Sequence, residues 1–508
     1  MPKAPQLRAT VLALTLSAIT LLALAAPANA RPFSTGVLDV DAYVQDSAIP
    51  FQRTKAAGAH YVKRNVYWSI VAPNTNNPNP PVDFNAVDRD DPHYNWESID
   101  KFVKNAVAHG LEPILTVTNS PRWARDRCTN VSECAPKAAP YAEFAYALAS
   151  RYDGTFNPGD GTLPRVRHFQ AWVEPNLDYF YKPVFQGRRP ISPTTYRAIL
   201  NPFYDMVHAV HPDNKVLTAG LAPLARPRTT VGPLDFLRRM LCLQGRRNPK
   251  PQRGCNGFAK FDILAIHPYT TGGPTHSAPG PDDLSLGDLH QASQLLRAAD
   301  RHRKIRRSSG PRRTPLWVTE FSYDSRPPDP GGLSNFYHVQ WSSEAMYRMY
   351  KAGVDVMIWF GYRDEKPDGR PHCEIFDSGL YRRSGNLAQD RPKPIMRAFR
   401  FPFAGIKGGR TVRYWGRTPD SRPGPVILQM KNGRGGLRTV KRVRAGAGGV
   451  FETNVRVRGG VQRNAVIRAR APRNGGSSLP FRLHFKRDFY QPPFGRCIRG
   501  GGGRPNAN

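Results

Sequence analysis

Short apolar runs alternate along this chain with longer stretches in which apolar residues recur every three or four positions. The short runs predict buried strands, and the longer stretches predict amphipathic helices. The predicted strands are Ser34–Val40, His60–Val66, Glu112–Thr118, Val166–Glu174, Lys215–Leu221, Phe261–His267, Pro315–Phe321 and Val354–Phe360. The predicted helices are Ile49–Ala57, Trp96–His109, Tyr141–Arg151, Pro193–His211, Leu234–Leu243, Ser285–Arg303, Asn335–Ala352 and Pro394–Phe401.

This alternation indicates an α/β fold in which residues 31–406 form a (β/α)8 TIM barrel with loop insertions. A doubly wound open sheet is the alternative architecture. It is disfavoured because no Gly-rich phosphate loop follows any predicted strand.

The pattern changes from about Lys407, where short alternating runs are separated by Gly-rich turns. This predicts a small antiparallel β-sandwich over residues 407–490. Its predicted strands include Val426–Met430, Leu437–Val443, Val450–Val457 and Ala465–Ala469. The Gly-rich residues 491–508 are expected to form a flexible tail.

The first 30 residues have the pattern of a secretory signal peptide. Lys3 and Arg8 precede the apolar run Ala9–Ala26, and Ala28-Asn29-Ala30 is a small-x-small cleavage site. An uncleaved membrane anchor is the alternative, since the run is about long enough to span a bilayer. We expect cleavage after Ala30, a secreted protein and no membrane span thereafter.

Six cysteines fit an oxidising compartment. They lie as two close pairs and one distant pair: Cys128 with Cys134, Cys242 with Cys255, and Cys373 with Cys497. Six cysteines allow 15 connectivities, among which this pairing is the most economical. None has the CxxC or Cys/His spacing of a zinc site, and no HExxH motif occurs. We therefore expect no catalytic metal and no cofactor.

The formal net charge of +35 is concentrated toward the C-terminus, because residues 404–508 contain 23 Lys and Arg against three acidic residues. On an exported protein, a basic surface fits an acidic polysaccharide or an anionic cell wall better than nucleic acid. The alternative is that the C-terminal module is only a spacer or stabilising domain.

Two segments, Trp172–Asn176 and Trp317–Phe321, each place one glutamate at the end of a predicted strand. In a parallel barrel the C-terminal ends of the strands converge on one face, so Glu174 and Glu320 are expected to meet there. A pair of facing carboxyls is what hydrolysis of a glycosidic bond requires. The alternative is that one or both are ordinary strand-end residues paired with Arg or Lys.

These two motifs, Trp-x-Glu-Pro-Asn and Thr-Glu-Phe, resemble those of the retaining glycoside hydrolases of clan A, families 5 and 39 in particular. The resemblance covers residues 33–402. It implies that Glu174 is the acid/base and Glu320 the nucleophile. One departure is Val173, because the family usually has Asn at this position, where it contacts the sugar 2-hydroxyl.

The resemblance also suggests further residues of a substrate cleft. Arg64 matches an arginine that braces the nucleophile, and His267-Pro268-Tyr269 resembles a His-x-Tyr motif that lines the cleft. Trp359 resembles the aromatic platform beneath the sugar, and Asn176 is another cleft candidate. Three of these residues have a structural alternative: a surface salt bridge for Arg64, a structural histidine for His267 and barrel core for Trp359.

The sequence therefore predicts a secreted retaining β-glycosidase that acts on a polysaccharide or oligosaccharide through two glutamates. A non-catalytic carbohydrate-binding barrel is the main alternative, which Val173 favours. A cell-surface adhesion protein that works through the basic C-terminal region is another. The sugar and linkage are not predicted, because variable loops decide them.

Overall fold

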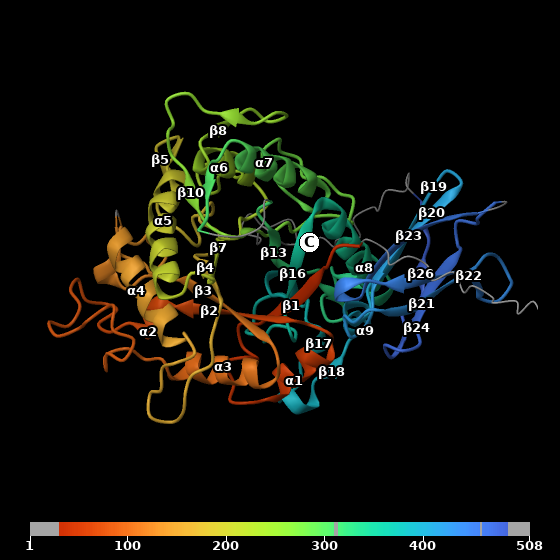
Figure 1. Ribbon diagram of the computed structural model, residues 1–508, viewed down its shortest axis with the longest axis horizontal. Coiled ribbons are helices and arrows are strands. Elements are labelled where there is room, and N and C mark those ends of the chain that lie inside the picture. Colours follow the sequence, from red (N-terminus) through yellow and green to blue (C-terminus); the bar gives the residue numbers. More distant parts are fainter. Residues whose placement is uncertain (1–29, 127, 309–312, 458–459, 486–508) are drawn as a thin grey trace, which may run out of the picture.

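The computed structural model describes residues 30–126, 128–308, 313–457 and 460–485. At its centre is a sheet of eight parallel strands (Figure 1). The strands, in sheet order, are β11 (Leu264–Ile266), β13 (Leu316–Phe321), β16 (Val354–Phe360), β1 (Ser34–Leu38), β2 (Tyr61–Tyr67), β3 (Glu112–Thr118), β4 (His168–Ala171) and β7 (Lys215–Thr218). A parallel bridge between Leu217 and Ile263 joins the two ends. The sheet is thus a closed barrel, as predicted, and not an open doubly wound sheet.

Helices surround the strands (Figure 1) and lie close to the predicted ranges. They are α1 (Ile49–Ala56), α2 (Trp68–Val71), α3 (Glu97–Ala108), α4 (Ala138–Arg151), α5 (Ser192–Val210), α6 (Pro233–Met240), α7 (Leu289–Arg301), α8 (Asn335–Ala352) and α9 (Pro394–Arg400). In α3, Ile99, Phe102, Val103 and Ala106 are buried, at the spacing that puts them on one face. Helix α8 ends where Gly353 adopts a left-handed φ of 93°.

Alternation along the strands sends side chains to two separate apolar cores. One core fills the interior of the barrel and comprises Leu38, Ile114, Leu217, Ile263, Trp317, Val356 and Ile358. The other lies between the strands and the helices and includes Val62, Val66, Leu115 and Trp359. Neighbouring residues of one strand therefore have very different surroundings.

The C-terminal module consists of two sheets, drawn in blue beside α8 and α9 in Figure 1. One contains β23 (Val450–Arg456), β20 (Thr411–Arg417), β19 (Phe403–Gly408) and β27 (His484–Phe485). The other contains β22 (Arg438–Ala445), β21 (Gly424–Lys431), β24 (Val466–Ala471), β25 (Gly476–Ser477) and β26 (Phe481–Arg482). The strands pair antiparallel, as expected, except that β19 and β27 pair in parallel. Strand β19 also begins at Phe403, ahead of the boundary expected after residue 406.

The module packs closely against the barrel. The ring of Trp415 lies 5.7 Å from that of Phe33 and 5.5 Å from that of Tyr350 on α8. The buried side chain of Arg417 donates from Nη1 to Thr35 Oγ1 of β1 at 2.8 Å. Apolar residues of the barrel and the module belong to one continuous core, so the module is not a loosely tethered appendage.

Two of the three expected disulfides are present, Cys128–Cys134 and Cys242–Cys255. The third expected pair includes Cys497, which lies outside the described residues, as do residues 1–29 of the expected signal peptide. Across the described ranges, no helix has the length and apolar character needed to cross a membrane.

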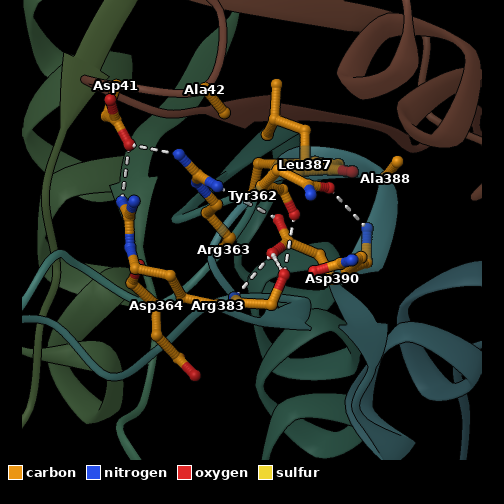
Figure 2. Close-up of polar contacts among 12 residues, drawn as sticks. Asp41, Ala42, Tyr362, Arg363, Asp364, Arg383, Leu387, Ala388 and Asp390 are labelled. Atoms are coloured by element: carbon orange, nitrogen blue, oxygen red, sulfur yellow. Dashed lines mark hydrogen bonds and ion pairs between the residues drawn. The ribbon is translucent and has the colours of Figure 1, made fainter.

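A network of charged side chains holds the loop after β16 against the end of β1 (Figure 2). The carboxylate of Asp39 accepts hydrogen bonds from backbone N–H groups, among them that of Tyr362 at 2.9 Å. Asp41 then accepts from Arg363 at 2.7 Å and from Arg383 at 2.6 Å. Because both strands end at this face, the network fixes part of the rim on which strand-end residues lie.

Candidate active site

Glu174 and Glu320 meet at the C-terminal ends of β4 and β13, where both contact the same histidine. His267 Nδ1 lies 2.8 Å from Glu174 Oε1 and 3.8 Å from Glu320 Oε2. These two oxygens therefore cannot be farther apart than the two distances combined. Both residues are nearly buried, with 4% of Glu174 and 9% of Glu320 exposed.

The backbone after β4 is strained at the glutamate. Trp172 has a φ of 75° and Glu174 a φ of 40°, values in the left-handed region that residues with a Cβ rarely adopt. The N–H of Glu174 donates to Gly220 O at 2.9 Å, which ties this segment to the end of β7. Strain of this kind is concentrated at functional sites, where the surrounding structure maintains it.

Gly220 provides the space that His267 occupies. A Cβ added to Gly220 would lie only 1.9 Å from His267 Nε2, closer than any real Cβ contact. A glycine is therefore required at this position for the imidazole to stand between the carboxylates.

Lys63, and not Arg64, is the cation beside Glu320. Lys63 Nζ lies 2.9 Å from Glu320 Oε1, and its side chain is fully buried. The expectation for Arg64 is corrected, because its guanidinium donates to the carbonyl and the hydroxyl of Ser98 on α3. Strand alternation explains why Lys63, and not Arg64, lies beside Glu320. Lys63 pairs in register with the interior residue Ile114, whereas Arg64 points toward the helices.

The two glutamates differ in the direction in which their surroundings shift the pKa. Burial raises the pKa of Glu174, an effect that its hydrogen bond from His267 only partly offsets. Burial also opposes ionisation of Glu320, but His267 and Lys63 outweigh it and hold the pKa of Glu320 below its usual value. One carboxyl is thus suited to carry a proton, and the other to remain ionised.

Tyr269 is near enough to both glutamates to feel their charges. Its ring stacks on that of Phe321 at 6.0 Å, and its side chain is buried. Burial, and then the negative charges of Glu320 and Glu174, raise the pKa of Tyr269 well above its usual range. The phenol therefore stays protonated and can donate a hydrogen bond within the site.

Trp359 is not brought to the carboxylates. Its indole packs in the outer core beneath the helices, 5.9 Å from the ring of His338 on α8, and Nε1 donates to Ser378 O at 2.9 Å. The expected sugar platform is thus corrected to core packing. Phe360, the next residue along β16, packs against the interior core instead.

Asn176 also has a structural role in place of the expected cleft role. Its amide donates to Ala222 O and to Val231 O, both at 2.9 Å, and its Oδ1 accepts from the N–H of Ala222 at 2.9 Å. The side chain is fully buried and clips together the loops that follow β4 and β7.

Sequence reasoning missed Lys63, Gly220 and two further interior residues, Gln170 and Thr319. A signal for Lys63 was available in the sequence. Val62, Arg64 and Val66 lie two residues apart and so share the helix-facing side of the strand, which leaves Lys63 on the interior side. No such signal marks Gln170 or Thr319.

Potential metal ligands do not gather at this site or elsewhere in the described part of the chain. No group of three or more His, Cys, Asp or Glu residues there is arranged to hold an ion.

The chain is similar in fold to several solved glycosidase structures. A family 39 glycoside hydrolase from Bacteroides cellulosilyticus is 14% identical, with 84% of this chain and 79% of that chain covered at a TM-score of 0.47. A glucosidase from Croceicoccus marinus is 15% identical, with 85% of this chain and 94% of that chain covered at a TM-score of 0.45. A GH30 endoxylanase from Clostridium papyrosolvens is 10% identical, with 85% of this chain and 95% of that chain covered at a TM-score of 0.42. Likeness of this degree does not identify an activity.

No protein-family model and no curated protein matches the chain.

Proposed function

We propose that this protein is a retaining glycoside hydrolase in which Glu174 is the acid/base and Glu320 the nucleophile. The observation that carries the proposal is the opposed environment of two carboxyls that share one histidine. The surroundings favour the proton on Glu174 and the negative charge on Glu320. These are the protonation states that the first step of a double displacement needs.

In that step a carboxylate oxygen of Glu320 attacks the anomeric carbon, and the bond from that carbon to the leaving oxygen breaks. Glu174 gives its proton to the departing oxygen, so the aglycone leaves as a neutral alcohol. In the second step Glu174 takes a proton from water while the water oxygen attacks the anomeric carbon and releases Glu320. Lys63 is placed to stabilise the negative charge that returns to Glu320 when the glycosyl bond breaks.

The placement of the two carboxyls around His267 is compatible with retention. Retaining enzymes hold the two groups about 5–5.5 Å apart, whereas inverting enzymes leave about 6.5–9.5 Å for a water molecule. The distances from His267 Nδ1 to the two carboxylates, 2.8 and 3.8 Å, set an upper bound on the separation of these oxygens, and that bound includes the retaining range.

A non-catalytic carbohydrate-binding barrel remains the alternative that Val173 suggests. Val173 is buried and offers no hydrogen-bonding group to a sugar 2-hydroxyl. Against this alternative stands the buried Lys63–Glu320 ion pair, since a sugar-binding site has no need of a desolvated carboxylate beside a second carboxyl.

We further propose that the enzyme is exported and that its C-terminal module contacts an acidic polysaccharide or anionic cell wall. The support lies in β22, an edge strand on which Arg438, Lys441, Arg442 and Arg444 are exposed. The two disulfides are compatible with an oxidising compartment.

The test begins with aryl β-glycosides and polysaccharides offered to the purified protein. For a substrate that is cleaved, Glu320→Gln should abolish turnover of both activated and unactivated glycosides. Glu174→Ala should spare activated aryl glycosides by a factor of about 100 or more relative to unactivated ones, because good leaving groups need little protonation. Equal losses on both substrate types in both variants would contradict the assignment of roles.

A further inference from the structure

A chain of buried hydrogen bonds crosses the barrel interior below the two carboxyls. Thr116 Oγ1 of β3 donates to Gln170 Oε1 of β4 at 3.0 Å. Gln170 Nε2 lies 3.2 Å from Thr319 Oγ1 of β13, which lies 3.0 Å from His267 Nε2. Through His267 Nδ1 the chain reaches Glu174. Thr116, Gln170, Thr319 and His267 are all fully buried.

Thr319 reaches the interior by strand alternation, because Trp317 lies in the interior core and Val318 in the outer core. Its neighbour Glu320 also reaches the interior because β13 is irregular at this point. The pairing of β13 with β16 shifts register between Val318 and Phe321. Such irregularities re-aim side chains, and here Thr319 and its neighbour Glu320 both make contacts inside the barrel.

The direction of each hydrogen bond follows from the groups that can only accept. Gln170 Nε2 also lies 3.0 Å from the carbonyl oxygen of Thr218, so the amide nitrogen must donate there. Its second N–H then donates to Thr319 Oγ1. The hydroxyl proton of Thr319 is left to donate to His267 Nε2 at 3.0 Å, since Thr319 Oγ1 already accepts from Gln170 and, among the described residues, His267 Nε2 is the acceptor within its reach.

We infer that Gln170 and Thr319 are positioning residues, which fix His267 as the tautomer with its proton on Nδ1 and so keep the acid proton of Glu174 on Oε2, the oxygen that does not contact His267. This inference rests on the proposed function for its catalytic consequence, but not for the tautomer itself. With Nδ1 already protonated, the imidazole donates to Glu174 Oε1 and cannot withdraw the catalytic proton. The proton is then held by Glu174 Oε2.

The other charged or titratable groups near the imidazole of His267 do not determine whether Nε2 carries a proton. Glu320 Oε2 lies 3.8 Å from Nδ1 and favours a proton there as well. Lys63 pairs with the other oxygen of Glu320, and Tyr269 stays protonated beside both carboxyls. None of these groups contacts Nε2, where Thr319 acts.

The tautomer can be measured without any substrate. In full-length protein labelled with ¹⁵N-histidine, the ring nitrogens of His267 are assigned by comparison with a His267→Gln variant. We expect a protonated Nδ1 and an unprotonated Nε2 in the wild type. Thr319→Val should move the proton toward Nε2, whereas Thr319→Ser, which keeps the hydroxyl, should restore the wild-type signature. A wild-type proton on Nε2, or an unchanged tautomer in Thr319→Val, would overturn the inference.

Kinetics provides the second readout. In Thr319→Val the carboxylate of Glu174 loses its donor, so the alkaline limb of kcat/KM should move up by about one pH unit. Activity on unactivated glycosides should fall about tenfold more than on activated ones. Gln170→Met, which removes the donor to Thr319, should shift the limb in the same direction.

The two failures are distinguishable. If the wild type is active and the alkaline limb of kcat/KM does not shift in Thr319→Val, the positioning role is refuted. A wild type that cleaves no glycoside would refute the proposed function, while the NMR result would still decide the tautomer.

Discussion

At the scale of single residues, the ion pair between Lys63 and Glu320 favours the ionised form that the proposed nucleophile needs. A fully buried ammonium 2.9 Å from a buried carboxylate favours the charged form of that carboxylate. Burial alone would have the opposite effect. Besides His267, the site therefore depends on a cation that the protein supplies from β2, which is not adjacent to β13 in the sheet.

Replacing Lys63 with Met should raise the pKa of Glu320 and move the acidic limb of kcat/KM upward by about 1–3 pH units. Lys63→Arg, which keeps the charge, should move the limb much less. The adjacent Arg64→Met is the matched control, since Arg64 contacts Ser98 on α3 and not the carboxylates. A limb that stays in place in Lys63→Met, or that moves equally in Arg64→Met, would contradict this role of Lys63.

The residue types at the site could be read from the sequence more easily than their orientations. Glu174, Glu320 and His267 were found because strand ends converge whichever face each side chain takes. Arg64 and Trp359 were misassigned because a one-residue change along a strand exchanges the interior for the helix-facing core. Asn176 was misassigned because nothing local reveals that its amide is used up by two distant loops.

At the scale of elements, the loop after β16 is held to β1 by the network around Asp41 (Figure 2). Burial alone would raise the pKa of Asp41, but hydrogen bonds from Arg383 and Arg363 lower it to about 2. A carboxyl whose pKa is lowered by folding contributes stability at pH values above its ordinary pKa of 3.8. That contribution disappears as the pH falls toward 2.

Asp41→Asn should therefore lower the melting temperature at pH 7, and the difference from the wild type should shrink as the pH falls from about 4 to about 2. Thermal unfolding followed by circular dichroism across this pH range measures the effect. Asp46→Asn, at an exposed carboxylate 3.7 Å from Lys101, is the control and should change little. A difference that is constant with pH would mean that Asp41 acts through shape and not through charge.

The elements themselves were largely predictable. All eight barrel strands, and the helices between them apart from the short α2, follow from apolar periodicity, because each element must bury one face. Strands β19 and β20 were not predicted, since their packing partners lie on α8 and at the start of β1, far away in sequence. Short edge pairings such as that of β27 with β19 leave no local pattern either.

At the scale of the whole molecule, the barrel and the C-terminal module share one core. A truncation after residue 406 would cut through β19 and expose the surfaces that Trp415 and Arg417 cover. Such a deletion would perturb folding as well as binding. Substitutions of exposed charges test the role of the module more cleanly.

The triple change Arg438→Gln, Arg442→Gln and Arg444→Gln on β22 should weaken retention on an acidic polysaccharide and reduce its dependence on salt. The matched control removes three exposed arginines from the barrel, Arg247, Arg297 and Arg301, with the same loss of charge. Retention is compared on acidic and neutral polymers at low and high salt. Equal retention of both triple variants would indicate that the β22 cations only protect a sheet edge from pairing.

The central claim is that Glu320 forms a covalent bond to the sugar, and mass spectrometry of a trapped intermediate tests it most directly. Activated 2-deoxy-2-fluoro β-glycosides of several sugars would be incubated with the wild type and with Glu320→Gln, followed by intact mass and peptide mapping. The account predicts one added glycosyl mass, located on Glu320 of the wild type and absent from Glu320→Gln. A label on another residue, or a hydrolysed substrate whose first product has the inverted anomeric configuration, would contradict it.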